Sequence, residues 1–173
     1  MTALRLLGAV CVVTACTVWG RLRALALRRT AGTLRAVCRL LMQLKSEITE
    51  LRTPLPELIG RLAAEAPDCC RGWLTALDAA MQDEPDARFA SLWQRTLKSD
   101  APPGLGEEET ECLCLLGLSL GRYDAPEQGA AIDRCLRETE RAQLRAEENA
   151  RTQGRLFTGL GLAAGLLLAI LLL

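Results

Sequence analysis

The strongest constraint on this sequence is an uncharged apolar run from Leu156 to Leu173. Because an α-helix rises about 1.5 Å per residue, such a run reaches roughly 27 Å, close to the hydrocarbon thickness of a bilayer. A buried core helix is the alternative, but such helices are rarely apolar on every face. We therefore predict a transmembrane helix over residues 156–173. The residues that mark this span are Leu156, Leu160, Gly161, Gly165, Leu168 and Leu173.

A second stretch, from Leu4 to Gly20, is apolar except for Arg5 and two threonines. It is followed closely by Arg21, Arg23, Arg28 and Arg29. Arginines also precede the first run, so both basic flanks face the region between the two apolar stretches. Basic flanks favour the cytoplasmic side of a membrane. We therefore expect an N-terminal membrane anchor over residues 1–20 and a cytoplasmic domain over residues 21–155.

The motif Val13-Thr14-Ala15-Cys16 allows a competing interpretation, because it resembles a lipoprotein cleavage box. In that case the chain would be lipidated at Cys16, and its helical domain would be translocated across the membrane. The arginines that follow argue against translocation. We favour the uncleaved anchor.

Composition argues against several classes of site. The chain has no histidine, its formal net charge is zero and its aromatic content is 3%, which disfavours imidazole chemistry and nucleic-acid binding. The eight cysteines form no CxxC pair, so we expect reduced thiols rather than zinc ligands. The sequence also lacks a GxxxxGK[ST] nucleotide-binding loop. No catalytic residue, metal site or cofactor is predicted.

Between the apolar ends the pattern is helical. The first helix is expected to continue to about Leu51. Pro54 is expected to lie in the first turn of the helix that follows. Three short helices and a loop over residues 99–106 follow. The apolar stripe expected on the first helix consists of Leu34, Val37, Leu41, Leu44, Ile48 and Leu51. Stripes for the three short helices are Leu55, Leu58, Ile59 and Leu62; Trp73, Leu74, Leu77 and Met81; and Phe89, Leu92, Trp93 and Leu97.

Another helix is expected to begin at a cluster of carboxylates and to end at Gly121. The cluster, Glu107 to Glu109 with Glu111, could serve metal binding or acid–base chemistry, but acidic residues are also favoured in a solvated first turn by the helix dipole. We favour the solvated turn. The residues predicted to be buried on this helix are Cys112, Leu115, Leu116 and Leu118.

The last helix is expected to start at Asp124 and to run into the membrane. Asp124 can cap it, Pro126 suits its first turn, and Glu127 stands at the capping-box position. With Gly121 as a left-handed stop, we interpret the loop Arg122-Tyr123-Asp124 as a hinge between two helices rather than a catalytic site. The inward stripe predicted on this helix is Ile132, Cys135, Leu136, Thr139, Ala142, Ala146 and Asn149. The fold class is therefore an all-α helical bundle with a C-terminal transmembrane helix and an N-terminal membrane helix.

Several short motifs in fixed order resemble the stage III sporulation protein AB family over nearly the full length. They are Leu6 to Ala9, Glu47-Ile48, Thr53 to Leu55, Leu116 to Asp124 and Gln128, with the glycine-dotted tail. The family's motif residues in this chain are Gly117, Gly121, Arg122, Tyr123, Asp124 and Gln128, which serve either as partner contacts or as structural elements.

The resemblance implies a non-enzymatic membrane component of a secretion-like channel between mother cell and forespore, in the mother-cell or outer forespore membrane. Its cytosolic bundle would be similar to the F-type platform domain of type II secretion systems. The implied partners are the cytoplasmic ATPase stage III sporulation protein AA, other membrane proteins of the complex, and membrane lipid.

Overall fold

The computed structural model describes residues 2–121 and 124–172, with side chains described for residues 14–15, 18–19, 21–121, 124–152 and 163. All regular structure in these residues is helical, which confirms the all-α prediction. The elements are α1 (Thr2–Ser46), the π-helical turn η1 (Glu47–Leu51), α2 (Leu55–Glu65), α3 (Asp68–Asp83), α4 (Phe89–Ser99), α5 (Glu107–Ser119) and α6 (Ala125–Leu172).

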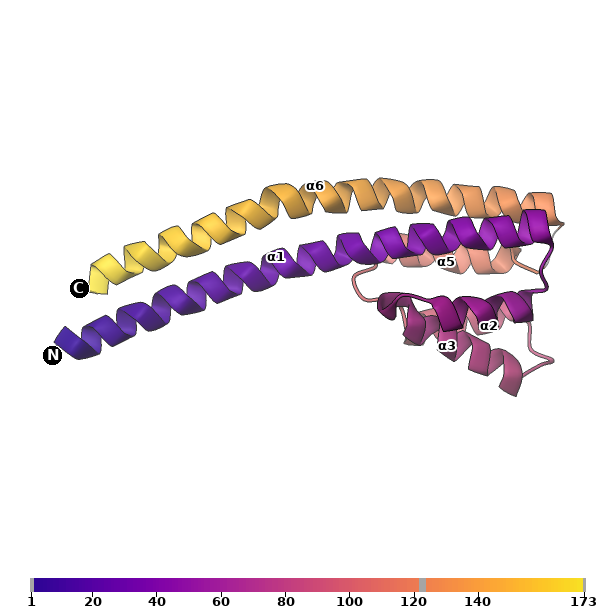
Figure 1. Ribbon diagram of the computed structural model, residues 1–173, viewed down its shortest axis with the longest axis horizontal. Coiled ribbons are helices and arrows are strands. Elements are labelled where there is room, and N and C mark those ends of the chain that lie inside the picture. Colours follow the sequence, from indigo (N-terminus) through magenta and orange to yellow (C-terminus); the bar gives the residue numbers. More distant parts are fainter. Residues whose placement is uncertain (1, 122–123, 173) are drawn as a thin grey trace. The chain divides into compact units, whose positions relative to one another are not determined.

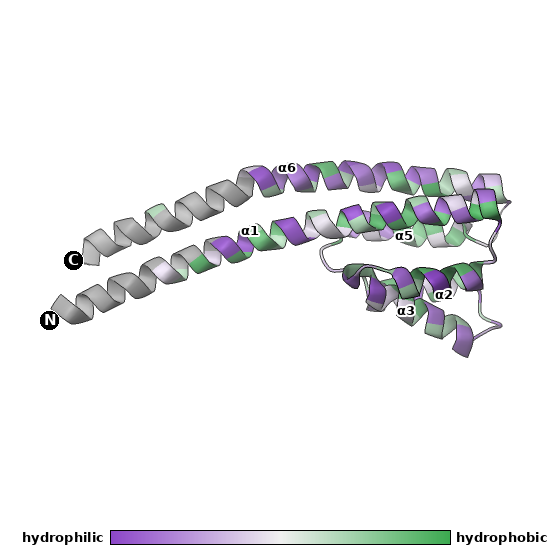
Figure 2. Cartoon of the chain, viewed as in Figure 1, coloured by the Kyte–Doolittle hydropathy of each residue, from purple (hydrophilic) through white to green (hydrophobic). Residues whose placement is uncertain are grey.

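The chain divides into two compact units. One contains residues 32–143, and the other contains Met1–Ala31 and Leu144–Leu173. The first unit comprises the shorter helices together with the C-terminal part of α1 and the N-terminal part of α6 (Figure 1). Within this unit, the stretches of α1 and α6 carry both hydrophilic and hydrophobic residues, as an amphipathic helix does (Figure 2).

The core of the 32–143 unit is built around two tryptophans. Trp73 of α3 and Trp93 of α4 pack edge to face, with ring centroids 4.8 Å apart, an arrangement that aromatic quadrupoles favour. The predicted apolar stripes of α2, α3 and α4 all point into this core, apart from Leu55, Met81 and Phe89, which are partly buried. The fully buried large side chains around the tryptophans are Leu41, Leu44, Leu58, Ile59, Leu74, Leu77, Leu97, Leu113, Leu120 and Ile132.

The first helix ends as predicted at Leu51, but through a π-helical turn that the sequence did not indicate. Leu34, Val37, Leu41, Leu44 and Ile48 are buried, whereas Leu51 is 65% exposed. The wider π-turn changes the angular spacing of residues, so Leu51 leaves the stripe. Pro54 was expected inside the first turn of the next helix. Instead it precedes α2 as the N-cap residue, and Pro56 occupies the first turn.

The prediction of the buried residues of α5 is confirmed for Leu116 and wrong for Leu115 and Leu118. Leu113, Leu116 and Gly117 are buried, whereas Leu115 and Leu118 are exposed by 58% and 44%. Cys112, also predicted to be buried, is only partly so. The physical reason is that α5 is apolar on nearly every face after its acidic first turn, so periodicity cannot select a face. Packing against Trp93 selects it, because a Cβ at Gly117 would overlap the indole ring of Trp93.

On α6 the predicted inward stripe is confirmed from Ile132 to Ala142, with Leu136 partly buried. Ala146 is also partly buried, but Asn149 is exposed, so its predicted inward position is wrong. The change coincides with the limit of the 32–143 unit, because both residues belong to the other unit.

In the unit formed by the chain ends, Trp19 and Leu22 are each 59% exposed, and the Arg23 guanidinium lies 5.6 Å from the centre of the Trp19 ring. Where the structure describes the residues, no helix has both the length and the apolarity that a membrane crossing requires. Outside the part of the chain whose side chains are described lie Cys16, Leu156, Leu160, Gly161, Gly165, Leu168 and Leu173. The predicted boundaries at residues 20 and 155 therefore stay predictions.

Candidate functional site

The end of α1 is organised by the buried side chain of Glu47. The Glu47 carbonyl oxygen accepts hydrogen bonds from the backbone N–H groups of Arg52 and Thr53. One carboxylate oxygen, Oε2, accepts a hydrogen bond from Thr53 Oγ1 at 2.8 Å and forms an ion pair with Arg61 of α2. These contacts hold Arg52 in the left-handed region, at φ 53°. A single residue thus joins the π-turn, the following linker and the next helix.

The turn after α5 requires glycine for two reasons. Gly121 has φ 75°, a conformation in which a Cβ is disfavoured, and this confirms the predicted left-handed stop. In addition, a Cβ on Gly121 would lie 3.0 Å from Leu55 Cδ1 of α2. The glycine therefore sets both the direction of the turn and its close approach to the start of α2.

The start of α6 is held against the end of α1. Asp124 directly precedes α6 as predicted, and its carbonyl oxygen accepts a hydrogen bond from the Gln128 N–H at 3.0 Å. A Cβ on Gly129 would lie 2.8 Å from Thr49 Cγ2, so this glycine allows α6 to approach the π-turn closely. Lys45 Nζ forms an ion pair with Asp133, at 2.8 and 2.9 Å from the two carboxylate oxygens.

These helix ends enclose an open pocket of ≈ 630 Å³, which we call the junction pocket. It brings the predicted site residues Gly121, Asp124 and Gln128 close to Thr53 and Leu55, from which they are far apart in sequence. Gly117 is not among them, because it lies beneath Trp93 in the core. Arg122 and Tyr123 lie outside the described residues. The pocket is lined by Ile48, Arg52, Thr53, Leu55, Gly121, Asp124, Ala125, Pro126 and Gln128.

Sequence reasoning missed three residues that shape the pocket: Arg52, Glu47 as its buried anchor, and Gly129. Glu47 was recognised only as part of a family motif, since a lone glutamate off the apolar stripe predicts a solvated side chain. Gly129 carried a usable signal, because glycine inside a helix is unfavourable unless close packing requires it. Arg52 carried no signal, because a non-glycine residue with positive φ is uncommon.

Burial makes several thiols of the 32–143 unit poor nucleophiles. Burial raises the pKa of Cys38 to about 11 and, with the neighbouring Cys69, that of Cys70 to about 12. A hydrogen bond that Cys135 donates to Cys112 lowers the pKa of Cys112, and the same bond, with burial, raises the pKa of Cys135. Thiols with raised pKa values stay protonated and are poor nucleophiles.

The acidic cluster at the start of α5 faces solvent. Glu107, Glu108 and Glu111 are exposed, and Glu109 is partly exposed. In the described part of the chain, no group of three or more cysteine or carboxylate side chains is placed to hold a metal ion. The cluster therefore offers surface charge at a helix N-terminus, where the helix dipole favours it.

Comparison with known proteins adds two findings. The family model for stage III sporulation protein AB matches residues 5–173. A solved structure of a stage III sporulation protein AB (SpoIIIAB) is similar to this chain, with a TM-score of 0.62 and 24% sequence identity. The similar region covers 68% of this chain and 93% of that chain, and this likeness concerns the fold. No curated protein sequence matches the chain.

Proposed function

Because this chain belongs to the stage III sporulation protein AB family, which gives it a sporulation-related role, we propose that it is a non-enzymatic membrane component that recruits a cytoplasmic ATPase. The single observation that carries this proposal is the family match, which extends over residues 5–173 and so includes both apolar ends and the whole helical region.

The proposed location is the mother-cell or outer forespore membrane, with residues 21–155 in the cytoplasm. The basic residues that flank both apolar stretches support this orientation, since they favour the cytoplasmic side. Residues 156–173 would form the transmembrane helix, and residues 1–20 would form the second anchor. Membrane lipid and other membrane proteins of a secretion-like channel would surround these segments.

The proposed partner is the ATPase stage III sporulation protein AA. In this proposal the helical unit acts like the platform domain of type II secretion systems, and it holds the motor at the membrane. Two features support a docking role over catalysis. The sequence has no nucleotide-binding loop, and the junction pocket is a packing junction whose glycines and Glu47 contacts are explained by structure alone.

A sedimentation experiment tests the proposal. The full chain is reconstituted in vesicles of phosphatidylethanolamine and phosphatidylglycerol, and purified stage III sporulation protein AA is added. We expect the ATPase to sediment with these vesicles and not with empty vesicles of the same lipids. Equal amounts in both pellets would contradict recruitment by this chain.

The lipoprotein interpretation remains the competing topology, because Val13 to Cys16 resembles a cleavage box. Protease treatment of intact protoplasts and a reporter fusion distinguish the cytoplasmic topology from the lipoprotein topology. If residues 21–155 are cytoplasmic, external protease spares the exposed loop at Pro103-Gly104, and a reporter fused after Leu173 behaves as extracytoplasmic. Cleavage of that loop from outside, with incorporation of a labelled lipid precursor at Cys16, would replace our topology with the lipoprotein one.

A further inference from the structure

The outward face of α5 carries two leucines that the described residues of the 32–143 unit leave largely exposed. Leu115 and Leu118 are exposed by 58% and 44%, and they lie one helical turn apart. Each borders a pocket between α5 and α4 or its flanking loops. The pocket beside Leu115, of ≈ 500 Å³, also contacts Leu105, and the pocket beside Leu118, of ≈ 530 Å³, also contacts Phe89. We call this surface the α4–α5 face.

This face is held rigidly by the core beneath it. Trp93 of α4 lies against Gly117 and donates a hydrogen bond from Nε1 to the Leu113 carbonyl oxygen at 2.8 Å. Beside it, Gln94 Nε2 donates to the Cys114 carbonyl oxygen at 3.2 Å. A surface with a fixed shape binds with less loss of conformational entropy than a mobile one.

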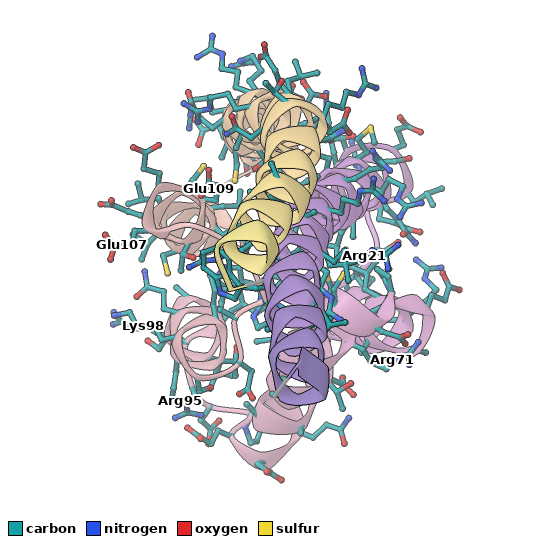
Figure 3. The ribbon with its side chains drawn as sticks, turned by 90° about the vertical axis from the view of Figure 1, so that its left-hand side faces the viewer. Arg21, Arg71, Arg95, Lys98, Glu107 and Glu109 are labelled. Atoms are coloured by element: carbon teal, nitrogen blue, oxygen red, sulfur yellow. The ribbon has the colours of Figure 1, made fainter. Side chains whose placement is uncertain are left out.

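Charge is distributed unevenly along the α4–α5 face. Glu107 and Glu111 line the pocket at the Leu115 end together with one cation, Lys98, whereas Arg88 lines the pocket at the Leu118 end. Figure 3 shows Lys98 and Glu107 projecting outward from α4 and α5, on the side of the view opposite Arg71. The face therefore runs from a net acidic end, across two leucines, to a basic end.

This pattern specifies the chemistry of an occupant. From Glu107 to Ser119, α5 extends roughly 18 Å at 1.5 Å per residue, which matches a partner helix of about three turns. Apolar residues of that helix would cover Leu115 and Leu118. Its N-terminal end, which has a positive dipole, would lie over Glu107 and Glu111, and an acidic C-terminal end would lie over Arg88.

Other occupants fit less well. The carboxylates at one end would repel anionic lipid headgroups and nucleic acid. Two copies with parallel α5 helices would set like charges opposite each other. Two copies with antiparallel α5 helices would run their α1 helices in opposite directions, although both α1 helices would have to enter one membrane under the proposed topology.

We propose that the α4–α5 face is the docking site for an amphipathic helix of a partner protein, basic at its N-terminal end, apolar in its middle and acidic at its C-terminal end. This inference rests on the proposed function in one respect, namely that the partner is the cytoplasmic ATPase.

The experiment uses the full chain in the vesicles described above and measures the concentration of ATPase required for half-maximal sedimentation. Leu115→Glu and Leu118→Glu should each raise this concentration about tenfold or more, since a charge is placed in the apolar centre of the interface. Met42→Glu is the matched control, because Met42 is 48% exposed on α1 of the same unit and lines neither pocket of this face. It should change the value less than about twofold.

Charge variants test the direction of the helix. Arg88→Glu and Glu111→Lys should each weaken binding, and high salt should reduce both effects. Lys98→Ala should instead strengthen binding, because it removes the cation from the acidic end. Circular dichroism and melting temperature of every variant establish that its fold is intact.

The outcomes separate the two proposals. If the wild-type chain binds the ATPase and the leucine variants bind equally well, the α4–α5 face is not the docking site, whereas recruitment stands. If the wild-type chain does not bind the ATPase, the proposed function fails, and this inference fails with it. If Lys98→Ala weakens binding, the proposed charge direction is overturned.

Discussion

Two helix ends border the junction pocket in the same left-handed conformation, but they achieve it with different residues. Arg52 after η1 has φ 53°, and Gly121 after α5 has φ 75°. At Arg52 the conformation is disfavoured by the Cβ atom, and hydrogen bonds to Glu47 hold it in place. At Gly121 the absent Cβ removes the penalty and leaves room for Leu55. The helix end at Arg52 thus depends on contacts with Glu47, whereas the helix end at Gly121 depends on the absence of a side chain.

The largest loss of stability is expected when a side chain is placed at Gly121. Gly121→Val places a β-branched residue at positive φ and forces it against Leu55, so the free energy of unfolding should fall by about 3 kcal/mol. Chemical denaturation measures the change. Gly72→Val in α3 is the control, because nothing lies within 4 Å of a Cβ at that position. Equal stability of Gly121→Val and wild type would show that the left-handed turn is dispensable.

Removing the polar partner at the other end should have the next largest effect. Glu47→Ala deletes the hydrogen bond from Thr53 and the ion pair with Arg61, and we expect a loss of about 2 kcal/mol. Since Arg61 is partly exposed, it can be solvated after the change, which limits the loss. Hydrogen exchange of the Arg52 and Thr53 amides should also accelerate. Unchanged exchange would mean that the backbone alone holds this helix end.

Asp124→Ala tests whether the start of α6 is structural. As the residue before the helix, Asp124 is expected to stabilise the first turn, and its loss should lower the free energy of unfolding by about 0.5–2 kcal/mol. The melting temperature provides the measurement. If it stays unchanged while ATPase binding to the vesicles is lost, Asp124 is a partner contact rather than a cap.

The smallest effect, and one of opposite sign, is expected at the arginine. Arg52→Gly relieves the left-handed penalty but increases the entropy of the unfolded chain, so a net gain of about 0.5 kcal/mol is expected. Paired denaturation curves of Arg52→Gly and wild type would reveal it. A clear loss of stability would instead assign a stabilising contact to the Arg52 side chain.

The contrast also explains which features could be read from the sequence. Gly121 and the prolines around residue 54 are residues whose own backbone chemistry ends helices, so the breaks were predictable. The buried position of Glu47 depends on Thr53 and Arg61, which approach only in the folded chain. The faces of α5 are equally apolar in sequence, and only Trp93 against Gly117 distinguishes Leu113 and Leu116 from Leu115 and Leu118. Tertiary contacts decide such cases.

The π-helical turn has a consequence for how this chain tolerates changes in length. A π-turn accommodates one more residue than an α-helical turn of the same helix. Deletion of the exposed Glu50 would therefore convert η1 into an ordinary α-helical turn, while Leu34 to Ile48 would keep their phase against the core. The same deletion in the middle of α1 would rotate every later core residue by about 100°. The end of α1 is thus a position where the deletion of one residue can be absorbed without rebuilding the bundle.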